Sequence, residues 1–283
     1  MISGGVPETG SHIARVTIEG VIVRNNDMME MIEKIGKDGN VKGVVLSIDS
    51  PGGSVVGSED LYLALRGLDS KKPVVALING IGASGSYIAA MAADHIVARE
   101  TAVVGSIGVL MRYPNFGKLL ETIGVEVDSI KSAPLKAEPS GVGPTPPEAR
   151  ESLQQVIDDA YTWFKNLVSQ RRDLSPQETA TVSDGRVFSA QKALSLKLID
   201  ATGTEKTAVE WLETKKNVEK GIPVKDWKPE SKNNALKFLD VAARLAHSLG
   251  FELLSGSLGS VEASMDISQL DGILAIWHPT LER

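Results

Sequence analysis

Ser84 is the residue whose type and neighbours best suit covalent chemistry. It lies in the run Gly82-Ala83-Ser84-Gly85-Ser86, where a predicted strand passes into a helix of small residues. Small neighbours leave a serine hydroxyl open to substrate, and a helix N-terminus offers free N–H groups to a developing oxyanion. The same run also fits a serine that only caps the helix. Either a nucleophile or a capping residue is therefore compatible with this motif.

A second glycine-rich run, Ser50-Pro51-Gly52-Gly53-Ser54, follows another apolar strand. Glycine lets a backbone N–H approach a ligand closely, so the N–H of Gly53 could join that of Gly85 in an oxyanion hole. An ordinary strand-to-helix turn would have the same composition. The run is not a P-loop, because it does not have the G-x-x-x-x-G-K-[ST] pattern.

A nucleophilic serine needs a base, and the histidines are poor candidates. His95 begins an apparent strand and suits a structural role, while His247 and His278 lie near the end of the chain. A lysine can replace histidine if burial lowers the lysine pKa enough to make the amine neutral. Lys136 has mostly apolar neighbours, but Glu138 is close and Lys131 is a second candidate. The residues alone leave both lysines open.

The composition excludes several classes of protein. Apolar residues make up 42% of the 283 and charged residues 23%, which is typical of a globular protein with a sizeable core. The net charge of -6 and the absence of a basic stripe argue against a nucleic-acid partner. No cysteine is present and no histidines pair at metal-ligand spacing, so we expect neither a metal nor a cofactor. No apolar run reaches the roughly 18 residues that a membrane span needs.

Strand and helix patterns alternate along the first two thirds of the chain. Apolar runs at 13–23, 43–48, 74–79 and 95–98 predict strands, and helical spacing predicts helices over 27–36, 56–68 and 148–172. This order indicates βαβ units and a mainly parallel α/β sheet, whose ligands bind at the carboxyl ends of the strands. Residues 1–12 read as a flexible arm and 221–234 as a linker, and 235–254 have the spacing of an amphipathic helix.

The motifs around Ser84 resemble those of the signal peptide peptidase A family, peptidase family S49. The resemblance covers about residues 13–215, and its motifs occur in the family's order. They are the runs 48–54, 80–94, 105–109 and 131–139, and 184–187 with 193–200. The family is a branch of the ClpP/crotonase superfamily, which implies a spiral of βαβ units over 13–220. Residues 221–283 would then be a linker and a helical C-terminal extension that contacts other subunits.

The resemblance also implies roles for individual residues. Ser84 matches the nucleophile and Lys136 its general base, so that the catalyst would be a Ser-Lys dyad. Gly53 and Gly85 match the oxyanion-hole donors, and Ser106 matches a serine that orients the lysine. The sequence departs from the family at Gly85-Ser86, where two glycines are usual.

The resemblance implies a serine endopeptidase that degrades remnant signal peptides or similar apolar peptides. It also implies a homo-oligomeric ring or dome in which partner subunits complete the sites. We expect a bacterial, membrane-associated and extracytoplasmic location, with an N-terminal anchor missing before Met1. Two alternatives stay open: a phage-type capsid-maturation peptidase of the same family, and a crotonase-like acyl-CoA enzyme that would use glutamates.

Overall fold

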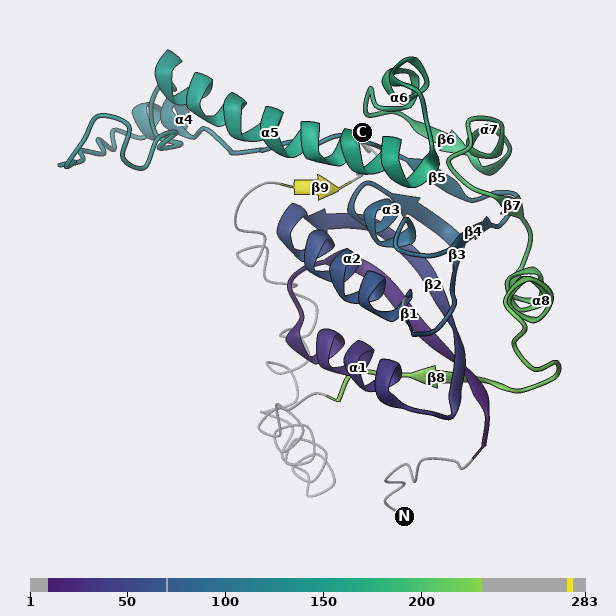
Figure 1. Cartoon of the computed structure of the whole chain (residues 1–283). Helices are drawn as coiled ribbons and strands as arrows, with labels where there is room; N and C mark the ends of the chain where they lie inside the picture. Colours follow the sequence, from purple (N-terminus) through teal and green to yellow (C-terminus); the bar gives the residue numbers. More distant parts are fainter. Residues whose placement is uncertain (1–9, 70, 231–273, 277–283) are drawn as a thin grey trace, which may run out of the picture.

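A computed structural model describes residues 10–69, 71–230 and 274–276 (Figure 1). The predicted flexible N-terminal segment, residues 1–12, lies almost wholly outside the described residues. The predicted helix over 235–254 lies outside them as well. Within the part that is described, no helix combines the length and the apolar composition required to cross a bilayer.

One mixed sheet forms the centre of the molecule. Its main path runs β6-β5-β3-β2-β1-β8, and β4, β7 and β9 pair at its side. Nearly all pairs are parallel; β5–β6 and β2–β9 are antiparallel. The strands are β1 (His12–Ile22), β2 (Val41–Ser54), β3 (Val74–Ala83), β4 (His95–Ala98), β5 (Val103–Gly105), β6 (Val187–Ser189), β7 (Ala201–Thr202), β8 (Val224–Trp227) and β9 (Leu274–Ile276).

Helices cover both faces of this sheet. Helices α1, α2 and α3 pack on one face, and α8 covers the other through Ala208 and Leu212 (Figure 1). The helices are α1 (Asn26–Lys37), α2 (Val55–Asp69), α3 (Gly85–Ala90), α4 (Gly117–Thr122), α5 (Pro147–Arg172), α6 (Pro176–Val182), α7 (Ala190–Ser195) and α8 (Glu205–Lys215). The prediction of a mixed α/β fold with a mostly parallel sheet is confirmed.

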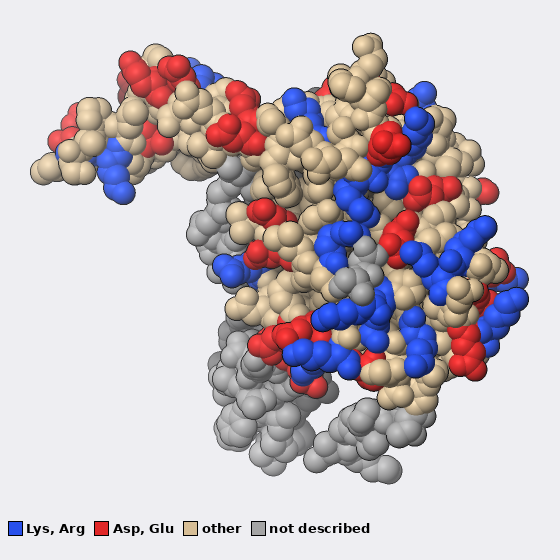
Figure 2. Space-filling model, in the orientation of Figure 1, with Lys and Arg blue, Asp and Glu red and all other residues tan. Residues whose placement is uncertain are grey.

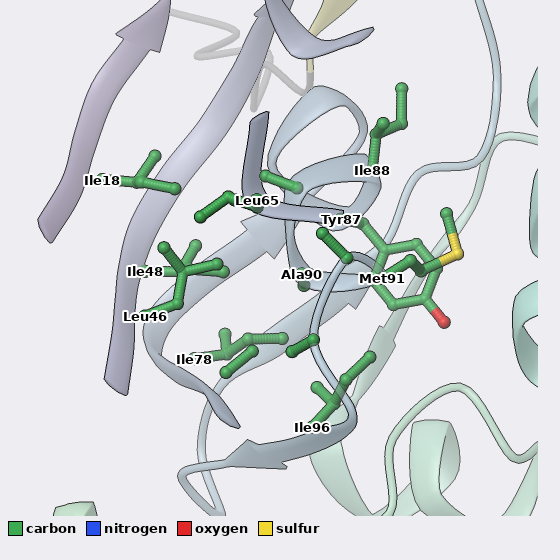
Figure 3. Close-up of a cluster of buried hydrophobic side chains, with 14 of the residues drawn as sticks. Ile18, Leu46, Ile48, Leu65, Ile78, Tyr87, Ile88, Ala90, Met91 and Ile96 are labelled. Carbon is green, nitrogen blue, oxygen red and sulfur yellow. The ribbon is translucent and has the colours of Figure 1, made fainter. Parts of the chain in front are cut away.

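The main core lies between the sheet and helices α1 to α3. Figure 3 shows Ile48 and Ile78 of neighbouring strands near Leu65 of α2. All three are buried in one cluster with Ile88 of α3. Strands in this position are covered on both faces, which explains their nearly continuous apolar sequence. Because α3 is entirely buried, the turn that precedes it has little freedom to move.

Two strands differ from the sequence prediction in a way that matters for the site. The run after residue 48 was predicted as a turn, but β2 continues to Ser54 because Gly53 pairs with Ile22 of β1. The linker predicted from residue 221 is corrected as well, since Val224–Trp227 form β8 beside β1. So short and polar a segment gives no strand signal of its own, and its pairing with a distant strand decides its structure.

His95 has the structural role that its position suggested. Its ring stacks on Trp211 with a centroid distance of 4.8 Å, and its Nδ1 lies 3.7 Å from Asp200. In the parallel pair β3–β4, His95 faces Val75 at the start of β3, whereas Ser84 follows the end of β3. The two residues therefore lie at opposite edges of the sheet, and His95 is no base for Ser84.

Burial against Trp211 should make stability depend on pH through His95. Burial lowers the pKa of His95 below its ordinary value of 6.5, although Asp200 opposes the shift. The unfolded chain then binds a proton more readily, so stability is full above pH 6.5 and falls as the pH drops toward the lowered pKa. Urea unfolding of His95→Gln at a series of pH values should show a smaller loss across this window than wild type. Equal losses in the two proteins would contradict the assignment.

Candidate active site

Ser84 occupies a strained turn between β3 and α3. Its backbone has φ 58° and ψ -120°, a conformation that residues with a side chain rarely adopt. The Ser84 N–H donates to the carbonyl of Gly105 on β5 at 2.7 Å, and the Ser84 carbonyl accepts from the first turn of α3. Strain of this kind persists only where the surroundings hold it, and it is concentrated at functional sites.

The hydroxyl of Ser84 is not used as a helix cap. Ser84 stands at the N-cap position of α3, yet its side chain makes no capping hydrogen bond. Within the described residues no other side-chain hydrogen bond engages it. In contrast, Ser175 at α6 accepts a capping bond from the N–H of Glu178. The capping role that the sequence left open for Ser84 is therefore not the one observed.

The ends of three parallel strands meet around this turn. Ala83 at the end of β3 pairs with Gly105 at the end of β5, so Ser84 and Ser106 follow neighbouring strand ends. Ser106 is also buried and has a positive φ of 51°. On the other side of β3, Ser50 of β2 pairs with Gly82. The sheet thus gathers Ser84, Ser106 and the glycine-rich end of β2 at one edge.

Gly53 and Gly85 contribute backbone rather than side chains to this edge. A Cβ on Gly53 would lie 1.8 Å from the carbonyl oxygen of Ile22, so no other residue fits. Gly85 opens α3, where the first N–H groups of a helix have no acceptor inside it. Gly53 thus lies three residues after Ser50 and Gly85 three residues after Gly82, the pair that joins β2 to β3. Their role as oxyanion-hole donors stays a prediction.

Buried serines join the glycine-rich end of β2 to the Ser84 turn. The Ser86 hydroxyl lies 2.6 Å from the carbonyl oxygen of Ser50 and 2.8 Å from that of Ala83. The Ser50 hydroxyl in turn donates to the carbonyl of Gly20 at 2.6 Å and accepts from the N–H of Gly52 at 3.2 Å. This network explains why a serine stands at position 86. The sequence patterns did not predict these roles for Ser50 and Ser86, although both are small polar residues next to buried strands.

Lys136 is not brought to Ser84 within this chain. It is exposed, and no hydrogen bond or ion pair joins its amine to any described residue. Lys131, the other candidate, forms an ion pair with Glu138, and that contact lowers the pKa of Glu138. Figure 1 shows the segment between β5 and α5, which carries both lysines, running out from the body beside α5.

The chain is similar in sequence to a family of peptidases and to several known proteins. Residues 66–219 match the sequence model of peptidase family S49. A Methanocaldococcus jannaschii protein named "putative protease" is 38% identical over 190 residues, which cover 67% of this chain and 61% of that protein. A Synechocystis protein of the same description is 37% identical over 208 residues, or 73% of this chain and 75% of that one. The chloroplastic serine protease SPPA of Arabidopsis thaliana is 31% identical over 215 residues, or 74% and 32%. The match to the first of these relatives spans less than two thirds of its length.

The backbone strain at Ser84 can be measured by two substitutions at that position. Ser84→Ala removes the hydroxyl but keeps a Cβ in the strained conformation, whereas Ser84→Gly removes both. We expect Ser84→Gly to be more stable than Ser84→Ala by about 1 kcal/mol, because released strain outweighs the extra freedom of the unfolded glycine. Chemical denaturation of the two variants measures the difference. A glycine variant that is less stable than the alanine variant would show that the turn is relaxed.

Proposed function

Because this chain belongs to peptidase family S49, we propose that it is a serine endopeptidase using Ser84 and Lys136 to cleave apolar peptides. The observation that carries this proposal is the strained Ser84 turn, whose hydroxyl is left out of helix capping. The family context favours peptide hydrolysis over the acyl-CoA chemistry of a crotonase-like enzyme. A phage-type capsid-maturation role would share this mechanism and differ in substrate.

In the proposed mechanism, the neutral amine of Lys136 takes the proton of the Ser84 hydroxyl. The oxygen attacks the peptide carbonyl, and the N–H groups of Gly53 and Gly85 stabilise the oxyanion. Lys136 then gives the proton to the leaving amine, and water hydrolyses the acyl-enzyme with Lys136 again accepting a proton. Ser106 would orient the amine from the end of β5.

We further propose that Lys136 reaches Ser84 of a neighbouring subunit. The supporting feature is the arm, residues 110–160, which stands away from the body in Figure 2 and carries both charged and uncharged surface. Most of the large apolar side chains that are exposed among the described residues belong to it. They are Phe116, Leu119, Ile123, Val125, Val127, Ile130, Leu135 and Val156. Exposed apolar surface of this extent is typical of a protein–protein contact.

A cavity of about 940 Å³ lies within the same arm. Leu120, Val125, Val127 and Val142 contribute to its lining, and Ser84 does not. A second copy of the chain could fill this cavity and cover the apolar side chains around it. The resulting ring or dome, acting on signal-peptide-like substrates near a bacterial membrane, is the assembly that the family resemblance implies.

The dyad is tested by peptide hydrolysis. Ser84→Ala and Lys136→Ala should each lower kcat/KM on an apolar, signal-peptide-like fluorogenic substrate by more than about 10³-fold, because proton transfer and attack act as a unit. Lys131→Ala is the matched control and should keep most of the activity, since its amine is engaged by Glu138. Full activity in Lys136→Ala would rule out Lys136 as the base. A capsid-scaffold peptide in the same panel distinguishes the phage-type substrate.

The origin of the lysine is tested by mixing two inactive variants. If Lys136 acts on a neighbour, Ser84→Ala and Lys136→Ala subunits reassembled together in equal amounts should regain about a quarter of wild-type activity. About half of the sites keep Ser84, and about half of these have a neighbour that keeps Lys136. No recovery would mean that both residues come from one chain.

A third substitution serves as the control for this mixing experiment. Ile130 is fully exposed on the arm, and Ile130→Asp should prevent both recovery and assembly as measured by light scattering. Recovery that persists without assembly would contradict the proposed contact through the arm.

A further inference from the structure

The C-terminal strand β9 lies on the glycine-rich end of β2. Leu274, Ala275 and Ile276 pair antiparallel with Ser54, Gly53 and Gly52. Residues 228–273 separate β9 from the preceding strand, so this contact joins parts of the chain that are far apart in sequence. No motif around 274–276 predicted it.

Register shows on which side of β2 this strand must lie. Gly52 and Gly53 pair with Val21 and Ile22 of β1 on one side. The other side pairs with β3 only as far as Ser50, which faces Gly82 near the end of β3. The strand β9 therefore lies on the β3 side of β2, beyond the point where the β2–β3 pairing ends, and it contacts α3. In Figure 1 it lies beside α3, the helix that Ser84 precedes.

Without β9, this edge of β2 would be open, and an open strand edge can bind a peptide. An extended peptide can add to such an edge through backbone hydrogen bonds, whatever its side chains. A substrate of Ser84 must present its scissile carbonyl next to Gly53, so it would have to use this same edge. The segment Ile273-Leu274-Ala275-Ile276 is also apolar in sequence, like the substrates proposed above.

We propose that β9 is an internal occupant of the substrate-binding edge at Gly52–Ser54, which competes with peptide substrates. This inference rests on the proposed peptidase function where it concerns competition, but the occupancy of the edge is independent of it. A segment in the same chain acts at a high effective concentration, so a three-residue strand is enough to compete. Substrates would enter by displacing the strand. The apparent affinity for substrate would then be the intrinsic affinity multiplied by the fraction of molecules in which the edge is free.

The test uses the full chain with two substitutions in β9. Leu274→Pro/Ala275→Pro removes two successive N–H groups, and because successive N–H groups of a strand point to opposite sides, one of them must face β2. Leu274→Val/Ala275→Val is the matched control, since valine keeps both donors and favours a strand. Hydrogen exchange of the Gly52–Ser54 amides reports occupancy directly, without any need for catalysis.

We expect the proline variant to exchange faster at Gly52–Ser54 and to have a lower apparent KM with kcat unchanged. If the strand is bound nine tenths of the time, the fall in KM is about tenfold. The valine variant should behave like wild type in both measurements. A synthetic peptide of residues 271–279 should inhibit the proline variant and restore slow exchange.

Each of the other possible outcomes contradicts one part of the proposal. Unchanged exchange in the proline variant would show that β9 does not occupy the edge. Faster exchange with unchanged KM would show that substrates bind elsewhere. If no variant cleaves any peptide, the proposed function fails; binding of a fluorescent apolar peptide to the proline and valine variants then decides whether β9 competes for the edge.

Discussion

The site depends on one constraint: the backbone at Ser84 must turn sharply with a positive φ while its hydroxyl stays unused. A serine at the start of a helix would ordinarily relax into a capping conformation. Here β5 prevents this, because the carbonyl of Gly105 holds the Ser84 N–H, and the fully buried α3 fixes the residues that follow. The packing of the core thus stabilises a strained turn whose hydroxyl is not used in helix capping.

The same constraint explains the glycines and serines around it. Gly53, which we propose as an oxyanion donor, is held against Ile22 without room for a side chain. The Ser86 hydroxyl ties this end of β2 to the Ser84 turn. These contacts are made by backbone and small polar groups, which pack closely enough to fix the geometry of a site.

Sequence patterns predict the parts of this structure that are stabilised locally or by burial. The apolar spacing of α1 and α2 and the apolar runs of β2 and β3 correspond to observed elements. The strands β8 and β9 were missed, because their structure comes from pairing with distant backbone. For the candidate site, residues next to buried strands could be placed from sequence, whereas the position of Lys136 depends on an arm with few contacts to its own domain.

This contrast between core and arm has a consequence for the proposed chemistry. A lysine acts as a base only when it is neutral, and a dry environment is what favours the neutral amine. In the single chain Lys136 is exposed to water, while the apolar side chains that could exclude water lie on the same arm. Association that buries those side chains would dry the amine and bring it to Ser84 in one step. A free subunit would then carry a strained nucleophile without a base, and assembly itself would create the peptidase.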